Sequence, residues 1–285
     1  MIECAVFLPD RGHLPIFDKL EKADYGSNLP MYEEFNERLD PFPDPPPACM
    51  SDQFAGWFYL PALRHLEIWL RDTTRLKERQ TSPDLSNLRT LVLARATIPE
   101  EDVPFILSRA TSLRNLHLGL AYPFYEGYVF EKSQSIVEAL KAVSTSVERL
   151  SMGFDHYPVV LKERALTGTE VSRYEHVQAT LKKFTRLQTL ELPMCLLVSY
   201  AVDYPATHDV DVSAIWPDTL REVVLRIDLK GTHENRWDEA RMADWVFDVF
   251  LLKQRDAVPD LEWIGVRFWD HVYDRGVVGY FYYWS

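Results

Sequence analysis

The sequence predicts an α/β solenoid, a right-handed horseshoe with about seven parallel strands on its concave face and helices on its convex face. Three observations support this fold class. A six-residue phrase with aliphatic residues at its first, fourth and sixth places occurs seven times. The segments between the copies carry apolar residues at helical spacing. Each unit is too short to bury its own apolar face, so neighbouring units must stack and share one core.

The phrase is clearest in Leu88–Leu93 and Leu113–Leu118, which begin 25 positions apart. The seven copies begin at Leu63, Leu88, Leu113, Val147, Leu187, Leu220 and Leu261, at intervals of 25, 25, 34, 40, 33 and 41 residues. The fourth and sixth places of a copy point the same way only if the backbone is extended. Each copy therefore predicts a short strand, and the uneven intervals predict insertions in the second half of the chain.

The segments between the copies predict helices. Ser135 with Glu138 forms a Ser-x-x-Glu capping box before the fourth strand. Asp102, followed by Pro104, begins a shorter helix. The expected helices lie near Asp102–Arg109, Ser135–Val143, Val177–Phe184 and Trp237–Arg255, the last capped by Asn235. A strand, a helix and a parallel strand, repeated, coil in a right-handed sense.

The two ends of the chain do not show the phrase. Residues 1–59 are acidic and rich in proline, and they form either an edge cap or the remnant of a preceding unit. The repeats then cover residues 60–268. In residues 269–285 the stretch Gly279–Trp284 is strongly aromatic. It forms a capping strand or flap over the last repeat, or else an exposed tail that binds a partner.

Composition excludes several classes of function. The formal charge of −12 and the lack of a Lys or Arg run oppose binding to nucleic acid. No stretch is long and apolar enough for a membrane span. Three widely spaced cysteines are too few to staple a chain of this size, which indicates reduced thiols. The sequence therefore predicts an intracellular protein, cytoplasmic or nuclear.

Motifs for catalysis, metals and cofactors are incomplete. The stretch His233–Trp237 lacks the second histidine of a zinc helix, and Asp209–Leu220 lacks the glycine and glutamate of a calcium loop. Nucleophile-elbow, dithiol and phosphate-loop patterns are missing from the sequence. We expect no catalytic residues, no metal and no cofactor, and hence not an enzyme. An enzyme whose site assembles only in space, or a purely structural domain, remains an alternative.

The candidate binding surface is the face that the strands turn away from the core. Its third-place column is His65, Thr90, Asn115, Arg149, Thr189, Glu222 and Trp263, and its fifth-place column is Glu67, Val92, His117, Ser151, Glu191, Val224 and Gly265. Residues in one column touch across neighbouring strands. The seventh place is small at Ala94, Gly119, Gly153 and Pro193 and large at Trp69, Arg226 and Arg267, which predicts a groove at mid-sheet. A solvated face without a ligand is the alternative.

The loops that follow the third, fourth and fifth strands are rich in tyrosine, and loops on a rigid scaffold often carry binding residues. Tyrosine is a preferred anchor at interface centres. We therefore expect a protein or peptide partner on the concave face and adjacent loops. The predicted partner-binding residues are Tyr122, Tyr125, Tyr157 and Tyr204 as apolar anchors, with His117, Arg149 and Glu191 fixing the register of the partner through polar contacts.

The seven copies resemble the leucine-rich repeat family, in its long, intracellular, helix-bearing class. The copy Leu187–Leu197 matches best, with Cys195 in the place where that family carries Cys or Asn. Other copies have Ala96, Ala121, Asp155 and Asp228 in that place. The irregular spacing is similar to fungal F-box-associated repeats, which implies recognition of substrates for a ubiquitin ligase. Since residues 1–59 show no F-box, a ligase adaptor would bind only through an F-box outside this chain.

Overall fold

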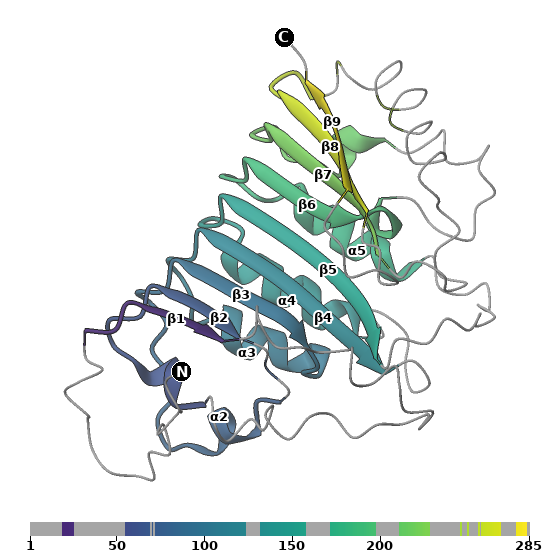
Figure 1. The fold of residues 1–285 in the computed structure, drawn as a ribbon. Helices are drawn as coiled ribbons and strands as arrows, with labels where there is room; N and C mark the ends of the chain where they lie inside the picture. Colours follow the sequence, from purple (N-terminus) through teal and green to yellow (C-terminus); the bar gives the residue numbers. More distant parts are fainter. Residues whose placement is uncertain are drawn as a thin grey trace.

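The computed structural model describes residues 19–25, 55–68, 70, 72–123, 132–157, 172–197, 211–228, 246, 250, 256, 258–268 and 278–283. These residues contain one nine-stranded sheet whose strands lie side by side in chain order, β1 to β9 (Figure 1). Strands β1 to β8 are parallel, and β9 is antiparallel to β8. The predicted α/β class and the parallel order of the seven repeated strands are confirmed.

Each copy of the phrase forms one strand of this sheet. The strands are β2 (His65–Ile68), β3 (Thr90–Ala96), β4 (Asn115–Pro123), β5 (Arg149–Tyr157), β6 (Thr189–Pro193), β7 (Glu222–Ile227) and β8 (Trp263–Phe268). The register pairs equivalent places, so that Leu66 opposes Leu91 and Leu91 opposes Leu116. The aliphatic residues at the fixed places are buried, except for half-buried Leu261. Strands β4 and β5 are longer than the phrase predicts.

The sheet has an eighth parallel strand, β1 (Lys22–Tyr25), which the phrase did not reveal. The carbonyl of Glu21 accepts the amides of Arg64 and His65, and the carbonyl of Arg64 accepts those of Arg89 and Thr90 in the same way. The segment from residue 20 to 25 is thus a degenerate copy. It has Ala and Tyr at its fourth and sixth places, so a search for large aliphatic residues misses it. The parallel sheet begins inside the acidic N-terminal segment.

Helices α3 (Val103–Leu107), α4 (Ser133–Val143) and α5 (Ser172–Leu181) form a layer on one face of the sheet (Figure 1). A further short helix, α2 (Thr74–Glu78), follows β2. The buried apolar side chains of these helices join those of the strands in one continuous core. The connections also contain the 3-10 turns η4 (Ala55–Tyr59), η5 (Glu100–Asp102), η6 (Met194–Leu196) and η8 (Val212–Ala214).

The predicted start of α3 is confirmed, whereas the predicted capping box of α4 is wrong. Asp102 is the N-cap of α3 with Pro104 in the first turn, although the helix ends at Leu107. Helix α4 begins at Ser133, two residues before the expected cap, so Ser135 lies inside its first turn. Glu138 accepts from Gln134 one turn earlier instead of capping the helix.

The helix expected over 237–255, with its cap Asn235, lies mostly outside the described residues. Two residues of its expected apolar face are described: Val246 and Phe250, and both are buried. The ring of Phe250 lies 5.2 Å from that of the fully buried Trp216, which follows η8. Among the described helices, none is long and apolar enough to cross a bilayer.

Strand β9 (Val278–Tyr283) comes from the aromatic C-terminal stretch and pairs along the whole of β8, from Trp263 opposite Tyr283 to Phe268 opposite Val278. An aromatic stretch has high strand propensity, and pairing satisfies the backbone groups that β8 would otherwise expose. This pairing agrees with the expected capping strand at the end of the repeats.

Candidate functional site

The candidate site lies on the ladder face, by which we mean the face of the sheet opposite α3, α4 and α5. Residues between the buried ones on each strand point to this face. Hydrogen bonds join neighbouring strands along the third-place column: Asn115 Nδ2 donates to Thr90 Oγ1 at 3.0 Å, and Thr189 Oγ1 donates to Glu222 at 3.1 Å. The predicted columns of touching residues are therefore present where these strands are described.

The groove expected over the small seventh-place residues at mid-sheet is filled at Gly153, and a fifth-place glycine of β8, Gly265, is covered in the same way. A Cβ at Gly153 would lie 3.2 Å from Nη2 of Arg226, because that guanidinium lies over the glycine. A Cβ at Gly265 would overlap the ring of Trp263 from the same strand. The absence of side chains at these glycines makes room for large residues of the same face. The expectation of an open groove is therefore wrong at Gly153.

Glu191 of β6 is the centre of a cluster of charged residues. Its Oε1 accepts from Nη1 of Arg226 on β7 at 3.0 Å and from Nη1 of Arg267 on β8 at 2.6 Å. Arg226 and Arg267 oppose each other directly in the β7–β8 register. Like charges in that position destabilise a sheet unless an acid lies between them. Glu191 supplies this acid from the neighbouring strand.

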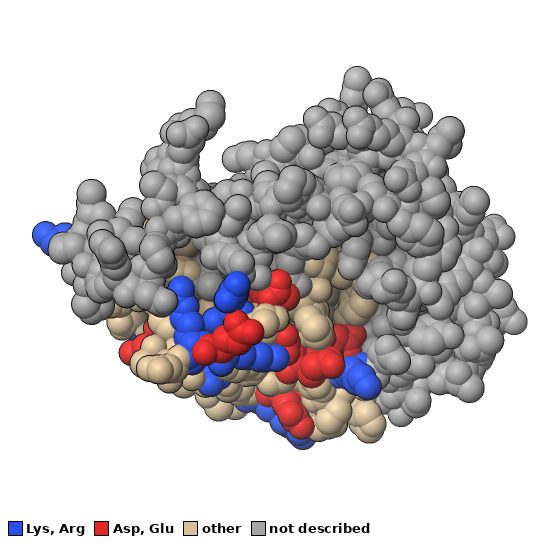
Figure 2. Space-filling model, turned by 90° about the horizontal axis from the view of Figure 1, so that it is seen from below, with Lys and Arg blue, Asp and Glu red and all other residues tan. Residues whose placement is uncertain are grey.

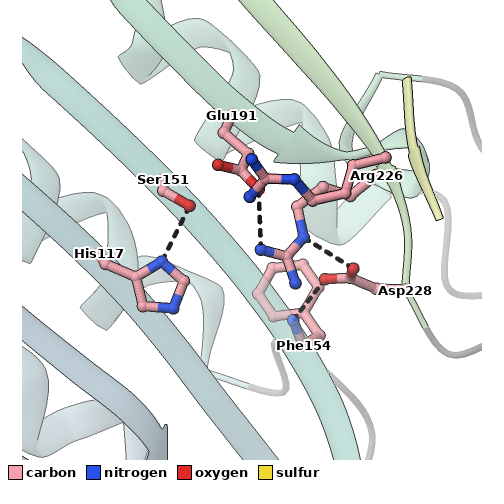
Figure 3. A network of polar contacts seen from close by, with 7 residues as sticks. His117, Ser151, Phe154, Glu191, Arg226 and Asp228 are labelled. Carbon is pink, nitrogen blue, oxygen red and sulfur yellow. Dashed lines mark hydrogen bonds and ion pairs between the residues drawn. The ribbon is translucent and has the colours of Figure 1, made fainter. Parts of the chain in front are cut away.

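Asp228 holds Arg226 from the other side (Figure 3). Its Oδ1 accepts from Arg226 Nε at 2.9 Å, and its Oδ2 accepts the backbone amide of Phe154 at 2.7 Å. Strand β6 ends at Pro193, whereas β5 runs on to Tyr157. Proline has no amide for a ladder, and the β5–β6 pairing stops at Glu191. Beyond that point the carboxylate of Asp228 links β7 to β5.

His117 and Ser151 complete the cluster from β4 and β5. They oppose each other in the register, and His117 Nδ1 lies 2.9 Å from Ser151 Oγ (Figure 3). Burial lowers the pKa of His117 to about 4, with a further lowering by the nearby guanidinium of Arg226. The imidazole is therefore neutral at neutral pH. We call His117, Ser151, Glu191, Arg226, Asp228 and Arg267 the polar cluster.

Arg226 carries its positive charge at neutral pH. Burial lowers the pKa of Arg226, but the carboxylates of Asp228 and Glu191 outweigh it, so the pKa of Arg226 is raised. Two guanidinium groups, two carboxylates and a neutral imidazole can together hold an anion or position a polar ligand by hydrogen bonds. They offer no metal site, because no group of three or more candidate ligands occurs in the described part of the chain.

A second group of buried acids lies at η5. Glu100 accepts from the hydroxyl of Tyr122 at 2.8 Å and from the amide of Lys132 at 2.6 Å. Asp102 accepts from Thr73 Oγ1 and Lys77 Nζ. Each acid binds segments that are more than twenty residues away in the sequence, so these contacts hold the segments between successive strands together.

The predicted site residues fall into three groups. His117 and Glu191 are brought into the polar cluster, and Arg149 is exposed on the ladder face, opposite Asn115 and Thr189. Tyr122 instead packs against the core, with its ring at 6.5 Å from Phe154. Tyr125 and Tyr204 lie outside the described residues, as do the side chains of Tyr157 and Cys195.

The prediction missed Ser151, Arg226, Asp228 and Arg267 as site residues. A signal for two of them, Arg226 and Arg267, was present in the columns: an acid at the fifth place of one copy, followed by arginines at the seventh place of the next two. Diagonal neighbours on adjacent strands lie within reach of such long side chains. Asp228 gave no such signal, because its partner Phe154 belongs to a strand that is not its neighbour.

Charges on the described part of the surface are mixed. On the face shown in Figure 2, basic and acidic side chains lie interspersed. Exposed cross-strand pairs such as Arg114 with Glu148 and Arg221 with Glu262 follow the same pattern. A scan of protein-family models and a search of curated proteins found no match to this chain.

Proposed function

We propose that this chain is a right-handed leucine-rich repeat solenoid that binds an extended segment of a protein or peptide on its ladder face. The observation that carries the proposal is the unbroken alignment of equivalent places across seven parallel strands. It makes columns of half-buried side chains spaced about 4.8 Å apart. Such a surface is long and rigid, which suits an extended chain better than a compact small molecule.

The charge of the molecule favours a protein partner over nucleic acid. The net charge is −12, and the basic residues on the face shown in Figure 2 are interleaved with acids. Nucleic-acid binding depends on several phosphate contacts from a basic patch. A protein partner needs only local complementarity and a few well-placed polar groups. The proposal implies that the partner is met in the cytoplasm or the nucleus.

One observation favours a second candidate function, hydrolysis by a serine nucleophile. His117 Nδ1 lies 2.9 Å from Ser151 Oγ, within the distance of a nucleophile and its base. A working pair also needs an acid that orients the imidazole and donors for the oxyanion. The nearby carboxylate of Glu191 instead binds two guanidinium groups. We therefore favour binding, and we expect a fluorophosphonate probe to leave Ser151 unlabelled.

The binding proposal is tested by blocking the ladder face at one exposed position. We expect Arg149→Glu to reduce partner capture in a quantitative pull-down by tenfold or more, since it reverses a charge in the centre of the third-place column. Lys141→Glu on α4 makes the same change at an exposed residue on the opposite side and serves as the control. Equal capture by both variants and the unmodified chain would contradict the proposal.

The ubiquitin-ligase role rests on the resemblance to F-box-associated repeats. Under this extension the bound protein is a substrate, and an F-box outside this chain recruits the adaptor. Co-precipitation of the full-length gene product with a ligase adaptor, followed by measurement of partner turnover, tests it. A stable partner level after loss of the protein would remove the ligase role and leave the binding role intact.

A further inference from the structure

We propose that Arg226 and Arg267 form a receptor for the side-chain carboxylate of an acidic peptide that lies extended on the ladder face. This inference rests on the proposed function and adds the chemistry of the partner. Two guanidinium groups that lie side by side on neighbouring strands match the geometry of a carboxylate, which accepts paired N–H donors.

The first argument concerns the donors that remain. A guanidinium carries five N–H donors. Within the polar cluster Arg226 uses Nε and Nη1, and Arg267 uses Nη1. Both Nη1 atoms donate to the same oxygen, Oε1 of Glu191. The ion pairs of the cluster therefore leave the Nη2 donors of both arginines for another acceptor.

The second argument concerns depth. The side chains of Asp228 and Glu191 are 3% and 13% exposed, whereas those of Arg226 and Arg267 are 19% and 41% exposed. The acids are thus less exposed than the guanidinium groups that they bind, and Arg267 presents the more exposed guanidinium of the two. Although the four formal charges balance, a molecule that approaches the ladder face meets the cationic side of the cluster first.

The third argument concerns preorganisation. Arg226 is fixed by two carboxylates and lies against Gly153, where no side chain displaces it. A donor that is already held in place loses little conformational entropy when a ligand binds. His117, neutral at neutral pH, supplies a polar wall without a further charge. The internal acids balance the formal positive charge, which suits one carboxylate better than a doubly charged phosphate.

The position of the cluster favours a side-chain carboxylate over a peptide C-terminus. Its residues come from β4 to β8, with β1 to β3 on one side and β9 on the other. A peptide whose C-terminal carboxylate was bound at Arg267 could run only toward β1 and would leave β9 without a contact. An acidic side chain in the middle of an extended segment lets the peptide use the columns on both sides.

The test uses the full chain and a library of acetylated, C-terminally amidated peptides with Asp or Glu at the centre, together with counterparts that carry phosphoserine or a free C-terminal carboxylate. Each peptide is paired with the same peptide carrying Asn or Gln. We expect binding peptides to prefer the acid by about tenfold to a hundredfold, the range of a charge-assisted hydrogen bond. Arg267→Ala and Arg267→Lys should both lose this preference, because a lysine cannot form the paired contact.

Arg221→Ala is the matched control. Arg221 is also an exposed arginine that pairs with an acid of the next strand, but it lies at the start of β7 and outside the cluster. It should keep the preference. Equal binding of acid and amide peptides, an unchanged preference in Arg267→Ala, or selection of phosphoserine or free C-terminal peptides would each overturn the inference. Loss of partner capture by Arg149→Glu would still support the proposed function in those cases.

Discussion

Arg226 illustrates how a charged residue is kept at the surface of a tightly packed sheet. It is bound on one side by Glu191 and on the other by Asp228, and it lies over a glycine. Burying a charge costs free energy unless partners replace the lost water. Here the partners come from β6 and from the residue after β7, so a single side chain couples several strands.

His117 gives a prediction for pH. Its pKa falls from 6.5 in the unfolded chain to about 4 in the folded chain, mainly through burial. The unfolded state therefore binds more protons between these values, and the free energy of unfolding falls as the pH drops from 6.5 to 4. We expect this group to account for a loss on the order of 2–3 kcal/mol. Below about pH 4 it contributes no further change.

Urea unfolding between pH 4 and 7 measures this loss. Carboxylates titrate in the same window, so the informative quantity is the difference between the unmodified chain and His117→Asn. The variant keeps a polar group opposite Ser151 but has no titration there. Parallel stability curves for the two proteins would show that His117 is not the sensor.

Gly153 gives a second prediction at the residue scale. A glycine within a strand normally destabilises it by roughly 0.5–1 kcal/mol relative to alanine, so Gly153→Ala alone would stabilise the chain. The new Cβ would lie 3.2 Å from Arg226 Nη2, and both Nε and Nη1 of that arginine are already held. We expect a net loss of about 1 kcal/mol in urea unfolding.

A double-mutant cycle isolates the cause of that loss. In an Arg226→Ala background the contact partner is gone, so Gly153→Ala should become neutral or stabilising. If the substitution costs the same in both backgrounds, the guanidinium is not what excludes a side chain at this position.

At the scale of elements, the alternation of faces along each strand decides the cost of a substitution. Leu91 and Leu116 are 0% and 2% exposed, whereas Thr90 is half-buried on the ladder face. We expect Leu91→Ala or Leu116→Ala to lower the free energy of unfolding by about 2–5 kcal/mol. Thr90→Ala loses one hydrogen bond from Asn115 and should cost about 1 kcal/mol or less. Equal losses in denaturant titrations would contradict this assignment of faces.

The early end of β6 gives the next element-scale prediction. Asp228→Ala removes the acceptor of the Phe154 amide and leaves Arg226 with one carboxylate. We expect a loss of about 3–5 kcal/mol in unfolding experiments, together with faster hydrogen exchange at Phe154. Asp218→Ala is the control, because Asp218 pairs with Lys182 while 87% exposed and should cost less than about 1 kcal/mol. Unchanged exchange at Phe154 would rule out the bridging role of Asp228.

At the scale of the whole molecule, the sheet is a row in which each strand contacts its neighbours, and its ends need protection. Strand β9 pairs along the last parallel strand, β8. We expect truncation after residue 268 to expose the edge of β8 and cause self-association, visible as a concentration-dependent mass in light scattering. A synthetic peptide of residues 278–283 added to the truncated chain should restore the original mass. A truncated chain that stays monomeric would show that β9 does not protect this edge.

The sequence by itself determined the class of the fold. Apolar residues alternate within each copy of the phrase, which predicts a buried strand, and they recur at helical spacing between copies, which predicts a helix. Both patterns depend only on local backbone geometry and on which residues avoid water. Seven of the eight parallel strands, and the buried faces of α4 and α5, followed from these patterns. The pattern did not predict strand β1, because its side chains are atypical and the copy is held by backbone hydrogen bonds that the carbonyl of Glu21 accepts.

Tertiary structure alone decided the candidate site. The columns predicted that His117 and Glu191 share a face, but the reach of Arg226 over Gly153 depends on rotamers and on a strand that ends early. Tyr122 lies in β4 on the side of the strand that faces the core, and its hydroxyl donates to Glu100. Alternation along a strand is a local property that sequence encodes directly. The contact between Asp228 and Phe154 joins residues 74 positions apart in the sequence, at a place where β6 no longer pairs with β5. Only the folded chain brings these two residues together.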